Sequence, residues 1–170
     1  MTSAELLADA FDRIRQVVGR TLDGMSDQRL AARVDPAANS IGWLVWHLTR
    51  IQDDHVAAVA GTEQAWTAEG WYDRFGLPFP PADHGYGHTA EQVGAVRVSA
   101  ELLAGYHVAV HARTAGYVRT LRDADLDRVV DASWDPPVTL GVRLVSVVSD
   151  DLQHAGQAAY LRGLLERTGR

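Results

Sequence analysis

Four long stretches of the sequence carry apolar side chains at steps of three and four residues, and this spacing constrains the fold more than any other feature. They cover about residues 2–22, 40–60, 99–122 and 139–167. The spacing places the apolar side chains of each stretch on one face of a helix. Amphipathic helices of this length, each with one apolar stripe to bury, form four-helix bundles. We therefore predict an all-α fold, an antiparallel four-helix bundle.

Polar residues and glycine mark where these helices begin and end. Thr2 and Glu5 have the three-residue spacing of a capping box, so the first helix should begin at Thr2. Asn39 or Ser40 is expected to cap the second long helix, and Gly61 to end it. A short helical piece is expected near residues 28–33, before the second long helix.

Residues 61–88 form a long connection between the second and third long helices, rich in proline, glycine and aromatic residues. A loop of this length inside a compact domain is usually functional or disordered. Its aromatic content favours an ordered loop that packs on the bundle, and its length allows a crossover. Thr89 and Gln92 then have the spacing of a second capping box, opening a short helix to about residue 98. The candidates for a short extended segment are Val129, Val130 and Val138.

The composition of the 170-residue chain excludes several classes of function. There is no cysteine, which rules out disulfide scaffolds, thiolate zinc sites, iron–sulfur clusters and cysteine nucleophiles. All 16 basic residues are arginine, so Schiff-base chemistry and the P-loop lysine are excluded as well. A net charge of −6 argues against nucleic-acid binding, which needs a basic face. At this length one domain over residues 1–170 is expected.

The segment around Met1 has neither the basic region nor the apolar region of a signal peptide. No apolar run approaches the roughly 20 residues that span a bilayer. We therefore expect a cytoplasmic protein without membrane or nucleic-acid partners.

Histidine is the most informative polar residue type, because helical bundles build metal sites from side chains that project inward from facing helices. Ligands three or four residues apart share one face of a helix. Asp150 and His154 have this spacing and lie with Asp151 in a polar island after an apolar stretch. Imidazole nitrogen and carboxylate oxygen suit a divalent metal. The alternative is that both aspartates face solvent while His154 bonds a neighbour.

His47 lies between the apolar positions Leu44 and Ile51, so it is expected to face the interior. Together with Asp150 and His154 it would complete a three-ligand site with an open position, which is typical of catalytic zinc. A single inward histidine is, however, more often a satisfied core residue than a ligand.

The remaining histidines offer further candidates. His107 and His111 are four residues apart on the third long helix, and taken alone they are a stronger metal-binding pattern than Asp150 and His154. The alternative is that one of them is buried and the other lies on the surface. His55, beside two aspartates, is expected to be a charge partner at a helix end. His84 and His88 lie in the long connection and would border a pocket.

Several segments resemble the signatures of the DinB/YfiT-like superfamily. Residues 39–48 are similar to its second-helix signature, and residues 150–157 are similar to its last-helix signature. Residues 71–76 and 85–89 resemble the connecting segment of its actinobacterial branch, which includes mycothiol-dependent transferases and a maleylpyruvate isomerase. High alanine and arginine usage without lysine is compatible with a GC-rich genome of that kind.

The resemblance implies a bundle with a metal bound between the second and last long helices. It implies His47 as the first ligand and His154 as the last. The middle ligand is usually His or Glu, and this sequence has Asp150, which is one methylene shorter than Glu. Asp151, at three-residue spacing from His154, is a less favoured substitute. Zinc or nickel is the expected metal, although imidazole and carboxylate also suit manganese and iron.

The resemblance also implies an activity, the transfer of a low-molecular-weight thiol such as mycothiol to a small electrophile. A metal with an open position can bind the sulfur of the thiol and lower its pKa. Trp46, His107 and His111 are expected to bind substrate, and Arg50 or Arg143 to receive a carboxylate.

Two other functions remain open. One is a non-catalytic protein of the same fold that binds a metal or a small ligand. The other is hydrolysis by a metal-bound water, which ranks lower because no general base is evident beyond the ligands. A homodimer is also expected, since bundles of this superfamily often pair through helix faces.

Overall fold

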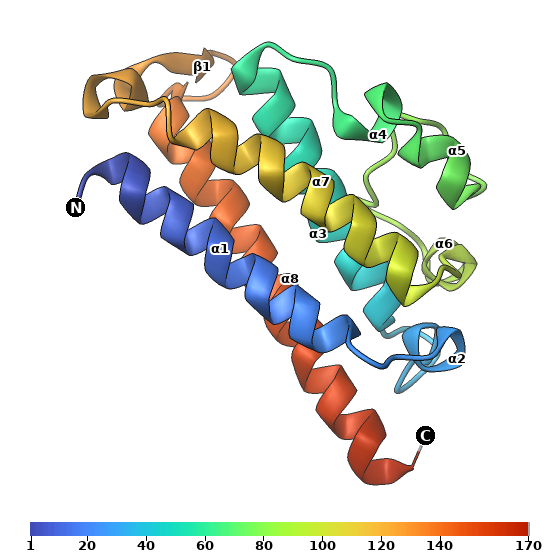
Figure 1. Cartoon of the computed structure of the whole chain (residues 1–170). Coiled ribbons are helices and arrows are strands. Elements are labelled where there is room, and N and C mark those ends of the chain that lie inside the picture. Colours follow the sequence, from blue (N-terminus) through green and yellow to red (C-terminus); the bar gives the residue numbers. More distant parts are fainter. Residues whose placement is uncertain (170) are drawn as a thin grey trace.

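The structure is a computed structural model that describes residues 1–169. Four long helices pack side by side: α1 (Ser3–Leu22), α3 (Ile41–Ala60), α7 (Ala100–Val118) and α8 (Leu140–Thr168) (Figure 1). Each packs against two others, in the order α1, α7, α3, α8 around the bundle. The all-α prediction is confirmed. Among residues 1–169, no helix is long and apolar enough to cross a membrane.

The predicted caps fix where two of the long helices begin and end. The Thr2 hydroxyl accepts from the Glu5 N–H at 3.2 Å, and the Glu5 carboxylate accepts from the Thr2 N–H at 2.8 Å. The Ser40 hydroxyl accepts from the Trp43 N–H at 3.1 Å, and α3 ends at Gly61, whose φ is +69°. These caps satisfy backbone donors that a helix leaves unpaired, and the left-handed residue after α3 is a glycine because glycine bears no Cβ.

Helices α3 and α7 run in the same direction, which explains the length of the connection between them. Thr49 bonds His107, and further along both helices the Tyr117 hydroxyl donates to the Val59 carbonyl at 3.3 Å. Two parallel neighbours cannot be joined by a short turn, because the chain must return along the full length of the bundle. The segment between α3 and α7 makes that crossover.

The crossover contains three short helices, α4 (Ala65–Ala68), α5 (Trp71–Phe75) and α6 (Ala90–Ala95). The sequence predicts α6 but treats the segment before it as irregular, so α4 and α5 are additions. The rings of Trp66 and Phe75 lie 5.1 and 5.6 Å from the ring of Tyr106 on α7. The aromatic residues therefore pack the connection onto the bundle, as expected.

Two smaller pieces complete the chain. Helix α2 (Asp27–Leu30) is the short helix predicted before α3. A 3₁₀ helix, η1 (Asp123–Asp127), leads into an antiparallel pair of short strands, β1 (Val129–Asp131) and β2 (Val138–Thr139), just before α8. The expected extended residues thus lie in the strands.

Helix α3 is the most deeply buried of the long helices, because the crossover covers the side that the bundle leaves open. Fifteen of its 20 residues are buried, among them His47, Thr49, Arg50, Gln52 and Asp53. Buried polar groups are costly unless they are paired, so each needs a partner from α7, α8 or the crossover. The polar residues of α3 therefore show where a site can be built.

Candidate metal centre

His47 of α3 and two residues of α8, Asp150 and His154, form one cluster. One potential ligand atom from each lies within 4.8 Å of the other two, and no other such group of three occurs among residues 1–169. The four-residue spacing on α8 turns Asp150 and His154 toward α3. The imidazole centroids of His47 and His154 are 4.9 Å apart, and His154 Nε2 lies 3.7 Å from Asp150 Oδ1.

Hydrogen bonds determine which nitrogen of each histidine is free. His47 Nδ1 lies 2.5 Å from the His84 carbonyl, and His154 Nδ1 lies 2.9 Å from Gln157 Oε1. Both partners are acceptor oxygens, so both Nδ1 atoms carry the proton and donate it. In the neutral imidazole each Nε2 then keeps its lone pair, as in metal-binding histidines whose other nitrogen is held by a carbonyl. Burial lowers the pKa of His47 below its ordinary value, which favours the neutral, metal-binding form.

Asp150 supplies the carboxylate of the cluster. Its Oδ2 is buried and has no hydrogen-bond partner among the described residues. A buried carboxylate oxygen without a donor is costly, and a cation between it and two imidazole nitrogens would satisfy it. The residue set therefore fits a divalent cation. His47 is 5% exposed, whereas the side chains of His154 and Asp150 are 19% and 34% exposed, so the cluster opens to solvent on its α8 side.

Asp151, the alternative ligand, does not belong to the cluster. It is fully buried, and neither of its carboxylate oxygens has a partner among residues 1–169. Burial, followed by the nearby charge of Asp150, raises its pKa well above the ordinary value. Of the two adjacent aspartates, only Asp150 offers an oxygen to the two imidazoles.

A turn of the crossover covers the buried side of His47, and it comes close enough only because it contains a glycine. Gly85 has a φ of +93°, and a Cβ there would lie 2.9 Å from His47 Nδ1 and 2.9 Å from the Trp46 ring. Only glycine combines this backbone conformation with this approach. Trp46, a predicted substrate residue, thus lies beside the cluster, although it is 1% exposed.

Polar contacts within the turn and to α3 hold it in place. Asp83 accepts from the Gly85 N–H at 2.8 Å and from His88 Nε2 at 3.0 Å. His88 Nδ1 in turn accepts from the indole N–H of Trp43 at 3.1 Å. The Trp43 ring stacks on His47, with centroids 4.7 Å apart and planes 11° from parallel. The imidazole of His47 is thereby fixed on one face by Trp43 and at Nδ1 by the turn.

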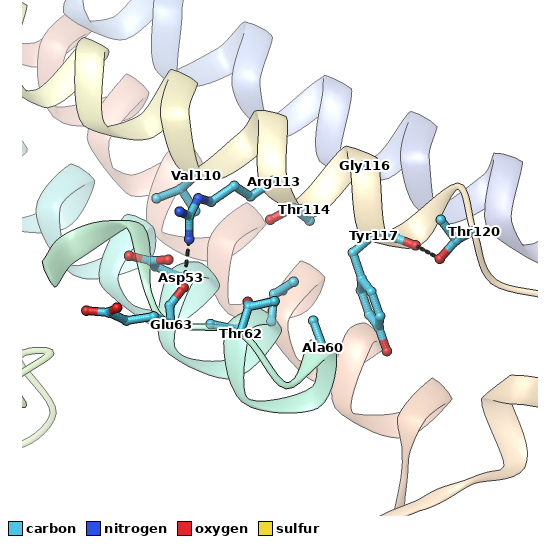
Figure 2. A pocket seen from close by; sticks show the side chains of 12 residues that line it. Asp53, Ala60, Thr62, Glu63, Val110, Arg113, Thr114, Gly116, Tyr117 and Thr120 are labelled. Carbon is cyan, nitrogen blue, oxygen red and sulfur yellow. Dashed lines mark hydrogen bonds between the residues drawn. The ribbon is translucent and has the colours of Figure 1, made fainter. Parts of the chain in front are cut away.

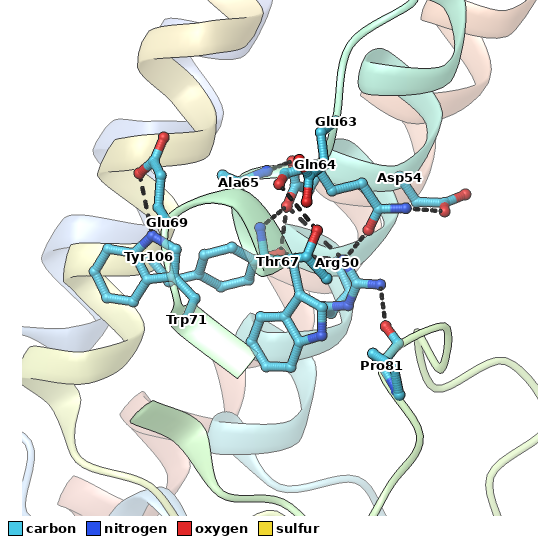
Figure 3. A network of polar contacts seen from close by, with 12 residues as sticks. Arg50, Asp54, Glu63, Gln64, Ala65, Thr67, Glu69, Trp71, Pro81 and Tyr106 are labelled. Carbon is cyan, nitrogen blue, oxygen red and sulfur yellow. Dashed lines mark hydrogen bonds and ion pairs between the residues drawn. The ribbon is translucent and has the colours of Figure 1, made fainter. Parts of the chain in front are cut away.

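Arg50 anchors the same turn from the bundle side. It is fully buried and donates to Gln64 at 2.7 Å and to the Pro81 carbonyl at 3.4 Å (Figure 3). It also donates to the Asp83 carbonyl at 3.2 Å. Its guanidinium also lies 3.8 Å from a carboxylate oxygen of Asp53. Arg50 is expected from the sequence to receive a substrate carboxylate, but the structure gives its donors to the protein itself.

The structure does not bring His107 and His111 to the cluster. His107 is 2% exposed and bonds the Thr49 hydroxyl at 3.1 Å, and burial lowers its pKa to about 3. His111 Nε2 lies 3.0 Å from a carboxylate oxygen of Asp12 on α1. The four-residue spacing does place the two histidines on one face of α7, but that face points to the core and to α1.

The other charged candidates also have protein partners. Arg143 donates to Asp131 at 3.2 Å. His55 lies 3.8 Å from Asp54, but burial lowers the pKa of His55 and so disfavours the charged form that the expected charge pairing needs.

A separate cavity of about 470 Å³ lies between α3 and α7 (Figure 2). Its wall includes Val110, Tyr117 and Arg113, and Arg113 donates to the Glu63 carbonyl at 2.7 Å. None of the three cluster residues lines it. This cavity is therefore not part of the candidate metal centre.

Sequence reasoning misses two features that orient the cluster. The first is Gln157, three residues after His154, whose helical spacing is a readable signal. The second is the His84 carbonyl, a backbone group that any residue type would supply, so no residue pattern identifies it.

Comparisons with known proteins agree with the fold and with the resemblance. The family model of the mycothiol-S-transferases matches residues 6–167. A search of curated proteins finds no match. Among solved structures, the chain is similar to the crystal structure of a conserved protein from Enterococcus faecalis, with 32% identity and a TM-score of 0.91 over 100% of this chain and 99% of that one. The chain therefore belongs to the mycothiol-S-transferase family, a DinB/YfiT-like family.

Proposed function

We propose that this protein is a metal-dependent transferase that joins a low-molecular-weight thiol, such as mycothiol, to a small electrophile. Membership of the family supports a thiol S-transferase kind of function. The observation that carries the metal dependence is the convergence of two free Nε2 atoms on an aspartate with an unpartnered buried oxygen.

In this proposal His47, Asp150 and His154 hold a divalent cation, with zinc or nickel favoured by imidazole and carboxylate donors. Such a cation lowers the pKa of a thiol that coordinates it, so that thiolate is available at neutral pH. Burial favours the neutral imidazole of His47, and the hydrogen bonds at Nδ1 aim the Nε2 of both histidines at the cluster. Trp43 and the turn of the crossover shield the His47 side, so thiol and electrophile approach from the solvent-exposed α8 side. Because the chain has no cysteine, the attacking sulfur belongs to the thiol substrate.

Elemental analysis of purified protein tests the metal site. We compare the wild type with His154→Ala and with His111→Ala, a matched control in which the lost histidine also pairs with a carboxylate but lies outside the cluster. The wild type and His111→Ala should retain about one metal ion per chain, and His154→Ala should lose it. Equal metal content in the wild type and His154→Ala would reject the site.

A turnover assay tests the activity. Conjugation of mycothiol to a panel of electrophiles, including a chlorinated aromatic, is measured with and without added metal. Turnover should require the metal and should be lost in His154→Ala but not in His111→Ala. Absence of turnover on the whole panel, with metal bound, would reject the transferase proposal.

A further inference from the structure

Two further pockets lie between α3 and α8, on opposite sides of the metal cluster along the two helices. One has a volume of about 300 Å³ and is lined by His55 of α3 and Arg143 of α8, among others. The other has a volume of about 290 Å³ and is lined by Leu44 of α3 and Gln157 of α8, among others. The cluster residues lie between these positions in the sequence of both helices, so the two pockets flank the cluster.

The walls of the two pockets differ in their chemistry. The first, which we call the basic pocket, is lined by three basic residues and one acidic residue: His55, Arg128, Arg143 and Asp131. The second, which we call the apolar pocket, is lined by two neutral amides and by five apolar side chains: Val34, Leu44, Tyr160, Leu161 and Leu164. Among residues 1–169, no charged side chain lines the apolar pocket. An apolar ligand therefore fits there without desolvating a protein charge, whereas in the basic pocket it would have to do so.

The apolar pocket adjoins the metal cluster directly. Gln157 lines the pocket, and its Oε1 accepts from His154 Nδ1 at 2.9 Å. Leu44 precedes His47 by three residues, which is a rise of about 4.5 Å along α3. A group bound in the pocket thus lies about one helical turn from both histidines. The residues that the sequence predicts to bind substrate, Trp46, His107 and His111, do not line this pocket.

The apolar pocket is open to solvent and large enough for a small organic group. Val34 and Tyr160 are 43% and 70% exposed, whereas Leu44 and Leu161 are buried, so the pocket has an exposed edge and an apolar floor. Exposed apolar side chains that gather at one place are typical of a ligand-binding groove. In another protein an apolar cavity of about 150 Å³ accepts benzene, so a pocket of about 290 Å³ has room for a substituted ring or a chain of several carbons.

We propose that the apolar pocket binds the uncharged, apolar part of the electrophile, so that the protein selects apolar electrophiles. The identity of the ligand as an electrophile rests on the proposed transferase function, whereas its apolar character rests on the lining of the pocket. An electrophile held there by its apolar part presents its reactive carbon to the cluster one helical turn away. The basic pocket on the other flank disfavours the same group, so the two flanks are not interchangeable.

A binding titration without thiol tests the pocket independently of any turnover. Methyl ketones with straight alkyl chains of two to six carbons have no reactive double bond, and they are titrated into ¹⁵N-labelled protein and followed by NMR. The chemical-shift changes should be largest at Gln157 and Leu164, and the Kd should fall by up to about fourfold for each added methylene group. Changes that are largest at Val110 and Tyr117 would place the ligand in the cavity between α3 and α7 and would overturn the proposal. A Kd that does not depend on chain length would overturn it as well.

A charge in the wall of the pocket gives the matched comparison. Val34→Asp introduces a carboxylate at the edge of the apolar pocket, and Val108→Asp introduces the same charge on α7, at a side chain that is 55% exposed and does not line the pocket. Val34→Asp should weaken binding of the longest ketone by at least about tenfold, because the ligand then has to desolvate the carboxylate. Val108→Asp should bind it as the wild type does. Equal Kd values for the two variants would refute the assignment of the pocket.

A turnover assay connects the pocket with the electrophile. Vinyl ketones with alkyl chains of one to five carbons differ in size on the side of the carbonyl away from the reactive double bond. In the reaction the sulfur of mycothiol bonds to the terminal vinyl carbon, and the thiol proton ends on the carbon beside the carbonyl. After subtraction of the uncatalysed rate, kcat/KM should rise by up to about fourfold per methylene group in the wild type and in Val108→Asp. This rise should be lost in Val34→Asp.

The two experiments separate failure of the pocket from failure of the transferase. Turnover that does not depend on chain length would overturn the pocket proposal and leave the transferase supported. Ketone binding at Gln157 and Leu164, without turnover of any vinyl ketone, would reject the transferase and leave the pocket supported as a site for apolar ligands.

Discussion

Replacing Gly85 with alanine tests whether the turn over His47 sets the affinity of the metal centre. The added Cβ would lie 2.9 Å from His47 Nδ1, 2.9 Å from a ring atom of Trp46 and 3.2 Å from a ring atom of Trp43. All three rings are buried, so none can swing into solvent. The turn must move outward instead, and the His84 carbonyl then moves away from Nδ1.

Two costs add in this variant. An L-residue with positive φ costs about 1–2 kcal/mol, and forcing a methyl group into a packed site costs about 1–3 kcal/mol. We therefore expect Gly85→Ala to lose about 2–5 kcal/mol of unfolding free energy. Loss of a hydrogen bond that orients a ligand typically weakens metal binding by about 10–100-fold, and we expect a loss in this range.

Gly87→Ala is the matched control, since Gly87 lies in the same turn with a φ of +75° but has no atom within 4 Å of its Cβ position. It should show the backbone cost alone, about 1–2 kcal/mol, with little change in zinc affinity. Urea denaturation of the metal-free proteins gives the stabilities, and calorimetric zinc titration gives the affinities. If both variants bind zinc equally well, the turn does not position His47, and the reasoning from the His84 carbonyl is refuted.

Three further predictions concern single side chains. Asp53→Asn leaves the buried guanidinium of Arg50 without its carboxylate and should lower the free energy of unfolding by about 3–5 kcal/mol in urea denaturation. The control Asp54→Asn should lower it by about 1 kcal/mol, and equal losses would contradict a buried ion pair. Burial lowers the pKa of His107 to about 3 in the folded protein, against 6.5 for an unperturbed histidine, so the unfolded chain takes up its proton first as the pH falls. This group should therefore lower the free energy of unfolding by about 1.4 kcal/mol per pH unit as the pH falls from 6.5 toward 3. In thermal unfolding measured as a function of pH, His107→Gln should remove this contribution to the pH dependence. Asp150→Glu keeps a carboxylate and should keep bound zinc, whereas Asp150→Ala should bind at least about 10-fold more weakly by calorimetry; equal affinities would remove Asp150 from the ligand set.

The helix boundaries are predictable because the chemistry that sets them is local. The hydroxyl of Thr2 and the carboxylate of Glu5 cap α1 from within one helical turn, and Gly61 ends α3 through its own backbone. Periodicity likewise places the long helices, since one stripe of apolar residues is enough to define a buried face. Helices α4 and α5 are missed because each is one short turn, with too few residues for a period.

The cluster is only partly predictable, because its parts come from distant segments. Helical spacing groups Asp150 with His154, and the inward position of His47 offers a third ligand, but no residue pattern shows that the two helices face each other; the structure brings the three together. The role of Arg50 is mispredicted because its partners include the carbonyls of Pro81 and Asp83, and a backbone group leaves no mark on the sequence. Their position depends on the path of the whole crossover.

The packing of α3 against α8 has a consequence for the mechanics of the chain. His47 and Asp150 are about 100 residues apart in the sequence, yet they belong to one cluster. A cation held there would be a removable cross-link between the second and last long helices, in a chain that has no cysteine for a permanent one. Because such a cation binds the folded state, free metal at about 1,000 times its dissociation constant would add about 4 kcal/mol to the stability. Metal supply would then control how long the folded protein survives as well as the proposed activity.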